Sequence, residues 1–242
     1  YGEEMSINHA DLYSLHIPFK MGFTHSQAKR LASDSFVIKL TAEESSGYGE
    51  AVIRDYVSGR VGEGRALESI REIATRLLEP LRSEDLTIQS LLKWSSEVEV
   101  EHRELPVLCA VETGLLDLLC KQKNEDIYSL LGREPVRTDL IYGGTLPMVP
   151  QAAAKAMLEQ YKKLAISTLR IKIGDDPDFN RTLLHTAHEM TGEDFDLRVD
   201  ANCVWNLDTV FQQLAFVFLC PCKEILGVLT SNWNKTQCRL FL

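Results

Sequence analysis

The sequence lacks several features that define large classes of proteins. No apolar run reaches the roughly 18 residues that a membrane-spanning helix needs. The first residues, YGEEMSINHADLY, have neither the basic start nor the apolar centre of a secretory signal. We therefore expect no membrane partner and a cytoplasmic location.

Positive charge is also scarce. Lysine and arginine together number 26 against 35 aspartates and glutamates, which gives a formal net charge of -9. Nucleic-acid binding depends on a basic surface. The charge balance therefore argues against a nucleic-acid partner and suits a protein that handles small molecules.

Cysteine is present, but without the rhythm of a disulfide framework. The 6 cysteines are scattered over 242 residues, and a chain of this size does not need such a framework. We expect them to be reduced thiols. Only Cys220 and Cys222 stand close together, and no second Cys or His pair lies at zinc-binding spacing, so an incidental apolar segment is favoured over a metal site.

A hydrophobic fraction of 45% is ordinary for a protein with a buried core, and the length permits one barrel or two domains. The first half predicts strands followed by amphipathic helices, which is typical of an α+β unit. The predicted strands are 6–17, 35–41 and 47–53, the predicted helices are 65–81, 106–121 and 126–131, and residues 97–104 are expected to be a solvated charge run.

From residue 139 the pattern changes to alternating strands and helices, which predicts parallel strands. The predicted strands are 139–145, 169–173 and 196–202, and the predicted helices are 149–164, 177–191 and a third that starts near Asn206 or Asp208.

Two of these strands carry charges along one face. Arg170 and Lys172 alternate with Leu169, Ile171 and Ile173. The next predicted strand has the same alternation of polar and apolar residues: Asp196, Arg198, Asp200 and Asn202 alternate with Leu197, Val199 and Ala201.

A polar face on two successive strands does not suit an open parallel sheet, whose strands are apolar on both faces. In a closed barrel, inner residues near the carboxyl ends of the strands line an active-site mouth, where Lys172, Asp200 and Asn202 would lie. The alternative is the exposed face of a half-covered sheet, with Asp200 opening a turn.

Five motifs occur in the order and spacing of a known family. They are GYGEA at 47–51, AVETGLLDL at 110–118, LLG at 130–132, RIKIG at 170–174 and VDAN at 199–202. Together they resemble the enolase superfamily, of the muconate-lactonizing enzyme and mandelate racemase type, in its muconate-lactonizing branch. The likeness covers the chain from Ile7 to Val210.

This resemblance implies an α/β protein in which an α+β capping domain, residues 1–135, precedes the first part of a modified (β/α) TIM-type barrel, residues 136–210. It implies a magnesium-dependent racemase, epimerase or cycloisomerase that removes the proton α to a carboxylate. The implied substrate is a small carboxylate such as an N-acyl amino acid or a dipeptide. Because that proton is weakly acidic, the site must supply a base and positive charge.

The resemblance also assigns roles to individual residues. Lys172 matches the acid/base lysine, and Arg170 replaces another lysine of the motif; arginine can hold a carboxylate but rarely acts as a base. Asp200 matches the first magnesium ligand, since Mg²⁺ prefers hard oxygen donors. Asn202 would contact substrate beside it.

A segment near the N-terminus falls where the family has a specificity loop. It holds Phe19, Phe23 and His25, which we expect near the substrate. Aromatic residues in surface loops are as often packing residues.

Residues 211–242 do not resemble the family. Its other metal ligands are a glutamate and an aspartate on later strands, and here only Glu224 is acidic after Asp208. A barrel of this type needs about 250 residues. We therefore expect a chain truncated after the third barrel strand, with a divergent tail and weak or absent Mg²⁺ binding.

Bare strand edges would favour a homo-oligomer. A catalytically inactive remnant or interaction module is the second hypothesis for function.

Overall fold

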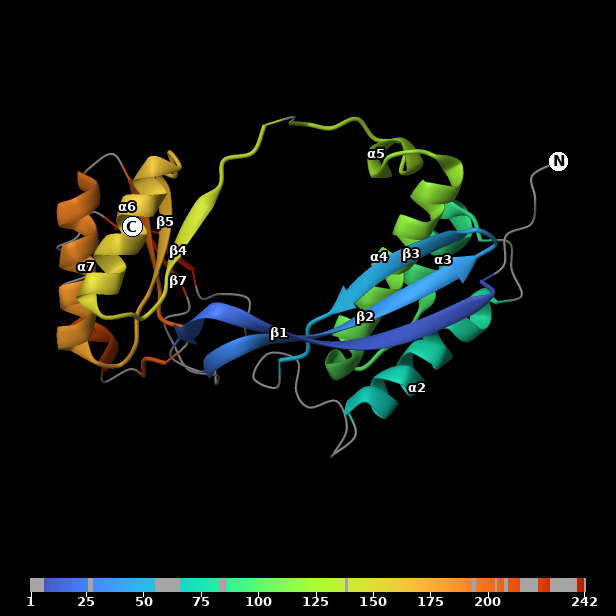
Figure 1. The fold of residues 1–242 in the computed structure, drawn as a ribbon, viewed down its shortest axis with the longest axis horizontal. Coiled ribbons are helices and arrows are strands. Elements are labelled where there is room, and N and C mark those ends of the chain that lie inside the picture. The colour runs from blue at the N-terminus through green and yellow to red at the C-terminus, as the bar shows by residue number, and fades with distance from the viewer. Residues whose placement is uncertain are drawn as a thin grey trace. The chain divides into compact units, whose positions relative to one another are not determined.

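The computed structural model describes residues 7–25, 28–54, 66–82, 86–137, 139–192, 195–202, 204–206, 209–213, 222–226 and 239–241. The chain divides into two compact units (Figure 1). Unit 1 comprises residues 1–18 and 32–138, and unit 2 comprises residues 19–31 and 139–242. Each unit has its own hydrophobic core.

A three-stranded sheet with the order β1-β2-β3 opens the chain. Its strands are β1 (His9–His25), β2 (Ala28–Ala42) and β3 (Ser45–Ala51), and β2 pairs with β3 in antiparallel register. The three predicted strands are present, but β1 and β2 extend well beyond their predicted ends. Hydrophobic alternation marks only strand segments that pack on a core, whereas backbone pairing continues past them.

The helices of unit 1 follow in sequence. They are α2 (Ala66–Leu78), the 3₁₀ turn η1 (Glu79–Leu81), α3 (Ile88–Glu97), the 3₁₀ turn η2 (His102–Glu104), α4 (Leu105–Lys123) and α5 (Ile127–Leu130). Helix α4 packs on β3 and supplies much of the core. No helix in the described part of the chain is long and apolar enough to cross a membrane.

Helix α3 was not predicted. It begins with a capping box in which Thr87 and Ser90 bond to each other's backbone N–H, and it buries Leu91 and Trp94. The sequence signal is weak because the helix has only 10 residues and three buried positions. The expected solvated charge run was also partly wrong, because the Glu104 side chain is only 13% exposed and is paired with Arg76.

Unit 2 is built on a sheet with the order β4-β5-β6-β7-β8. Its first elements alternate as predicted: β4 (Gly143–Leu146), α6 (Gln151–Lys163), β5 (Thr168–Lys172), α7 (Pro177–Thr191) and β6 (Asp196–Asp200). The strand pairs β4–β5 and β5–β6 are both parallel.

The predicted strand 139–145 is wrong for its first four residues. Gly143 is paired with Thr168, the first residue of β5, so no backbone of that strand reaches residues 139–142. Leu140 and Ile141 are accordingly 79% and 76% exposed. An apolar run predicts a strand only where a neighbouring strand is long enough to pair with it.

Two further strands join this sheet in the tail. β7 (Cys222–Leu226) is parallel to β6, and β8 (Arg239–Phe241) is antiparallel to β7. The sheet therefore has more strands than the three that the pattern predicted. Residues 209–213 are helical, and the remainder of the predicted third helix lies outside the described residues.

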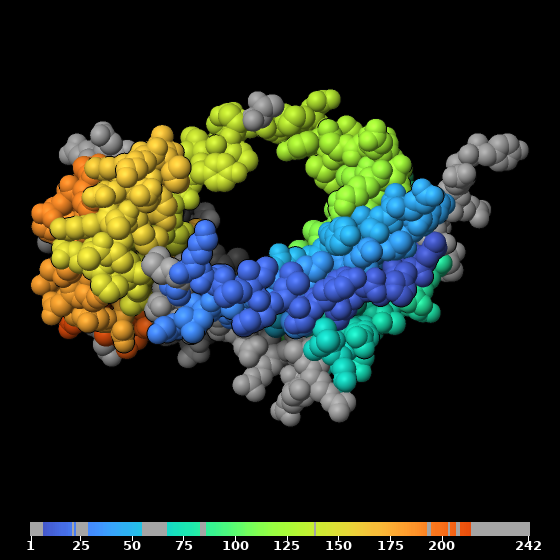
Figure 2. All heavy atoms as spheres, in the orientation of Figure 1, coloured from blue at the N-terminus to red at the C-terminus, as the bar shows by residue number. Residues whose placement is uncertain are grey.

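Helices α6 and α7 pack together and form one continuous outer layer of unit 2 (Figure 2). The sheet residues buried against these helices are those that the alternation predicted to share a face: Leu169, Ile171, Ile173, Leu197, Val199 and Ala201. The opposite face of β5 and β6 carries the charged side chains.

Candidate functional site

The carboxyl ends of β5 and β6 bring together the charged residues that the sequence singled out. Lys172 and Asp200 are the last residues of their strands and stand in register. The Lys172 Nζ donates to Asp200 Oδ2 at 2.6 Å and to Asn202 Oδ1 at 3.1 Å. Lys172 is only 8% exposed and Asp200 only 7%, so this ion pair is shielded from water.

Asn202 completes the cluster through an unusual backbone conformation. Its φ of 50° lies in the left-handed region, which asparagine tolerates better than most residues. In this conformation its backbone N–H donates to Asp200 Oδ1 at 2.9 Å. The residue therefore engages both partners, Lys172 with its side chain and Asp200 with its backbone.

Arg170 adds a second cation to the same carboxylate. Its guanidinium lies 3.9 Å from Asp200 Oδ2, and its side chain is about half exposed. In the sheet register it stands beside Arg198, which is ion-paired with Asp196 at 3.2 Å. A cavity of about 480 Å³ lies toward the amino ends of β4, β5 and β6 and includes Arg170 but not Lys172 or Asp200 in its lining. It is lined by Ile141, Gly143, Gly144, Thr145, Thr168, Arg170, Asp196 and Arg198.

The described residues do not fit a tightly held magnesium ion. Both oxygens of Asp200 already accept hydrogen bonds, and the only other oxygen donor in the cluster is the amide of Asn202. The β7 residue in register with Asp200 is Leu226, which has no donor side chain. No group of three acidic, histidine or cysteine side chains in the described parts of the chain could hold a metal ion.

The predicted substrate-contacting residues of the N-terminal segment lie in β1 rather than in a loop. Phe19 is 39% exposed, and residues 19–31 are counted in unit 2 with the strands that carry Lys172 and Asp200. The side chains of Phe23 and His25 lie outside the described part of the structure. Their proximity to a substrate stays a prediction.

Sequence reasoning missed a buried polar network at Gly174, two residues after Lys172. It joins Gly174, Asn180, Trp205 and Gln213 by hydrogen bonds. The available signal was modest: a glycine just after a strand and an asparagine on the first turns of the next helix.

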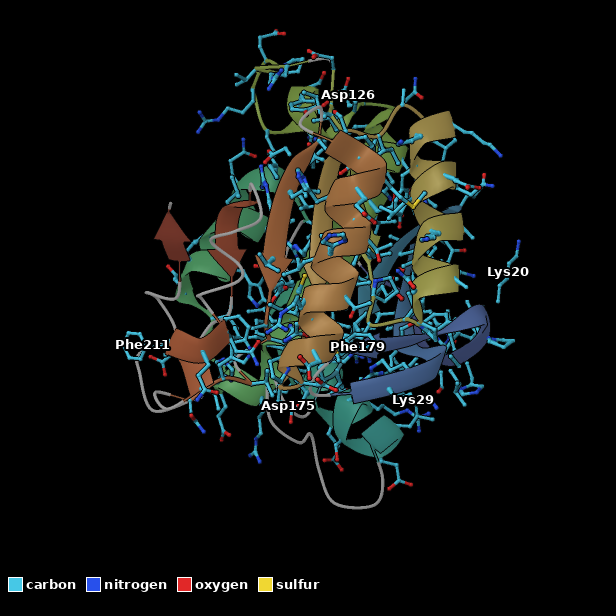
Figure 3. The ribbon with its side chains drawn as sticks, turned by 90° about the vertical axis from the view of Figure 1, so that its left-hand side faces the viewer. Lys20, Lys29, Asp126, Asp175, Phe179 and Phe211 are labelled. Carbon is cyan, nitrogen blue, oxygen red and sulfur yellow. The ribbon has the colours of Figure 1, made fainter. Side chains whose placement is uncertain are left out.

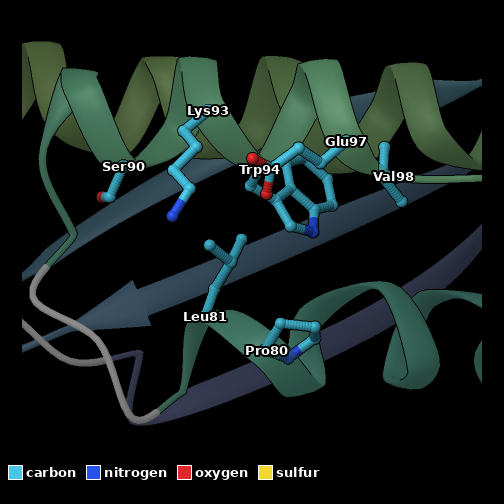
Figure 4. A pocket seen from close by; sticks show the side chains of 7 residues that line it. All are labelled: Pro80, Leu81, Ser90, Lys93, Trp94, Glu97 and Val98. Atoms are coloured by element: carbon cyan, nitrogen blue, oxygen red, sulfur yellow. The ribbon is translucent and has the colours of Figure 1, made fainter.

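A second cavity, of about 250 Å³, lies in unit 1 between η1 and α3 (Figure 4). It is lined by Pro80, Leu81, Ser90, Lys93, Trp94, Glu97 and Val98. Four of these residues are apolar, namely Pro80, Leu81, Trp94 and Val98, and none of these seven described residues belongs to a buried ion pair. The strand-end cluster of unit 2 is therefore the better candidate for chemistry.

Comparison with known proteins first defines the class of fold. A muconate-lactonizing enzyme from Pseudomonas fluorescens, solved with muconolactone, superposes with a TM-score of 0.79 at 17% identity, covering 94% of this chain and 61% of that one. A dipeptide epimerase from Enterococcus faecalis, solved with Mg and the dipeptide L-Leu-L-Tyr, gives a TM-score of 0.75 at 18% identity, covering 94% and 62%. The predicted fold class, a capping domain followed by part of a modified TIM-type barrel, is confirmed.

Proteins related in sequence include the same types of enzyme as the structural neighbours. An L-Ala-D/L-amino acid epimerase from Populus trichocarpa is 26% identical over 173 residues, which cover 70% of this chain and 39% of that protein. A hydrophobic dipeptide epimerase from Enterococcus faecalis is 27% identical over 206 residues, covering 83% and 55%. Muconate cycloisomerase 1 from Acinetobacter baylyi is 26% identical over 202 residues, covering 78% and 50%.

These relatives and the shared fold relate the chain to the enolase superfamily, of the mandelate racemase and muconate-lactonizing type, which confirms the predicted resemblance. No protein-family model matches the sequence. The chain spans about half the length of the curated relatives that it matches.

Proposed function

We propose that the chain carries part of an isomerase active site. In this site Lys172 abstracts the proton α to the carboxylate of a small substrate. The observation that carries this proposal is the buried cluster in which Asp200 and Asn202 hold the Lys172 amine at the end of β5. An amine fixed in this way can meet a substrate proton in one orientation, which lowers the barrier to transfer.

The proposed step starts from the neutral amine of Lys172, after one ammonium proton has passed to solvent. The Cα–H bond of the substrate then breaks, its proton moves to Lys172 Nζ, and an enolate is left. The reverse transfer restores the C–H bond. Because an amine exchanges its protons with water, the returning proton comes from solvent. A single acid/base is therefore enough for isotope exchange, whereas inversion at Cα needs a second group on the opposite face.

Arg170 would hold the substrate carboxylate. Its guanidinium presents five donors in a planar fork, and among the described residues its one ion pair is the 3.9 Å contact with Asp200. The half-exposed side chain borders the cavity beside β4, so a ligand can reach it. Positive charge at this position also stabilises the negative charge that develops on the substrate carboxylate as the proton leaves.

The relatives favour dipeptides and related amino-acid derivatives as substrates. Two of the sequence relatives are an amino acid epimerase and a dipeptide epimerase, and one solved neighbour holds L-Leu-L-Tyr. A muconate-type acid is the alternative small carboxylate, because a cycloisomerase is also among the relatives.

Magnesium is present in the structures of two dipeptide epimerases, from Enterococcus faecalis and Cytophaga hutchinsonii. Among the described residues, the strand-end cluster supplies one carboxylate, from Asp200, and one amide oxygen, from Asn202, and the carboxylate already accepts a hydrogen bond from Lys172. A site of this composition binds the ion weakly, since Mg²⁺ gives up water reluctantly. No step proposed for Lys172 or Arg170 depends on the ion.

The test is α-deuterium uptake in deuterated water, followed by NMR with a panel of dipeptides and N-acyl amino acids, with and without magnesium. We expect uptake that falls at least about 100-fold in Lys172→Met, the loss typical of removing a general base. Lys155→Met is the matched control because Lys155 is an exposed lysine of α6. Uptake equal in the two variants, or absent from the unsubstituted chain, contradicts the proposal and favours a non-catalytic interaction module.

A further inference from the structure

The segment that follows β5 is held by a buried polar network. The Gly174 N–H donates to Asn180 Oδ1 at 2.9 Å, and Asn180 Nδ2 donates to Gly174 O at 2.8 Å. One asparagine side chain thus satisfies both polar groups of a single residue. Asn180 belongs to α7 and is fully buried. Figure 3 labels Asp175 and Phe179 at this end of the helix.

Two more residues converge on the same backbone. The Trp205 indole N–H donates to Gly174 O at 2.7 Å, and Trp205 is fully buried. Gln213 accepts from Asn180 Nδ2 at 3.0 Å and donates to Asp175 O at 3.0 Å. The network therefore ties the segment after β5 to the start of α7 and to two parts of the chain, at Trp205 and Gln213, that are 31 and 38 residues away from their partners in it.

This network lies next to both halves of the strand-end cluster. Gly174 follows Lys172 by two residues, and between them the Ile173 N–H donates to Asp200 O at 3.1 Å. After the other strand, β6, Trp205 follows Asn202 by three residues. The network thus restrains the backbone at Gly174 and Trp205, close in sequence to Lys172 and Asn202.

We infer that Asn180 is a positioning residue: by clamping the Gly174 backbone to α7, it sets the place of the Lys172 amine between Asp200 and Asn202. The inference rests on the function proposed for Lys172. Small displacements of a proton-transfer group are costly, since a 1 Å misplacement can lower a rate by about 100-fold. A buried asparagine whose three bonds serve only stability would not affect the amine in this way.

The test combines two readouts in the full chain. With ¹³C-labelled lysine, the ε-methylene signal of Lys172 is identified by its loss in Lys172→Met and then followed in Asn180→Ala and Trp205→Phe. Trp205→Phe removes one hydrogen bond and keeps an aromatic ring, although a smaller one, so it tests the network even where Asn180→Ala does not fold. The control is Thr186→Val, because Thr186 is fully buried on the same helix and bonds to Thr182 and Gln151 instead of to Gly174.

We expect both network variants to shift the Lys172 signal and Thr186→Val to leave it in place. We also expect α-deuterium exchange to fall by about 10- to 100-fold in Asn180→Ala, through kcat more than through KM. A Lys172 signal that is unmoved in both network variants overturns the inference. If the unsubstituted chain shows no exchange, the proposed function fails, and the lysine signal still decides whether Asn180 positions Lys172.

Discussion

At Gly49 the backbone of β3 lies so close to helix α4 that a side chain has no room. A Cβ atom built there would be 1.8 Å from the backbone oxygen of Ala110, and one at Gly47 would be 2.1 Å from the oxygen of Gly114. These contacts involve backbone atoms, which cannot move aside as a flexible side chain can. The two glycines of the GYGEA motif thus permit the tight packing of strand on helix in unit 1.

Gly49→Ala is therefore expected to destabilise unit 1 by about 3 kcal/mol or more, the upper range for overpacking a core. Urea unfolding followed by circular dichroism measures the change. Gly143→Ala is the control, because its nearest contact would be an ordinary 3.5 Å to Thr168 O. Equal stability of the two variants would show that α4 does not approach β3 this closely.

The strand-end residues could be found from the sequence because their signal is local. Alternation in β5 and β6 predicts that Lys172 and Asp200 share a face, and parallel pairing places them side by side. Asn180 could not be found in this way, because its partners are separated from it by up to 33 residues and its role depends on a backbone close approach. Asparagine on a helix predicts no particular contact.

Among the elements, η2 is joined to α2 by one charged pair. Arg76 donates to Glu104 Oε2 at 2.7 Å, and the Glu101 backbone N–H donates to the same oxygen at 3.0 Å. Burial alone would raise the pKa of the Glu104 carboxyl, but these hydrogen bonds and the charge of Arg76 outweigh it, so the pKa lies below its ordinary value. The folded state therefore holds Glu104 ionised more strongly than the unfolded chain does.

A carboxyl with a lowered pKa stabilises the folded state above its unfolded pKa, and this contribution is lost as pH falls through the lower folded pKa. We expect Arg76→Met to cost about 0.5 kcal/mol at neutral pH, a value discounted because Arg76 is half exposed. The cost should shrink towards zero in acid. Chemical unfolding at several pH values measures it, with Arg71→Met, an exposed arginine of the same helix, as the control. A cost that is independent of pH would mean that Arg76 acts through packing alone.

Helices and strands were predictable where a pattern of apolar residues continues over many positions. Helix α4 is long and rich in apolar residues, and α7 carries an apolar stripe and a clear start, at Asp176 followed by Pro177. Helix α3 is short, and the distal part of the β1–β2 hairpin has no consistent alternation, so sequence periodicity could not predict either. The capping box of Thr87 and Ser90 was a usable signal, although it comprises two residues without the glutamate that usually marks such a box.

At the scale of the whole molecule, the change from strands-then-helices to strict alternation predicted two architectures, and two cores are observed. The assignment of residues 19–31 to the second unit could not be predicted, because it depends on which surface the hairpin contacts and not on its own sequence pattern. Strands β7 and β8 were equally beyond prediction, since the tail has no family motif to compare.

This organisation predicts a specific response to limited proteolysis. The chain passes between the units after residues 18, 31 and 138. The third connection is exposed around Arg133 and Arg137, and Val136 between them is 98% exposed. Trypsin should therefore cut first after one of these arginines, because an exposed connection opens more readily than a packed helix or strand. Because residues 19–31 belong to unit 2 although they precede the cut, the two fragments should still elute as one species in size-exclusion chromatography and separate only on a denaturing gel.

The Arg133→Gln, Arg137→Gln double variant should resist this cut. Fragments that elute separately would show that residues 19–31 do not stay bound to the rest of unit 2 in solution.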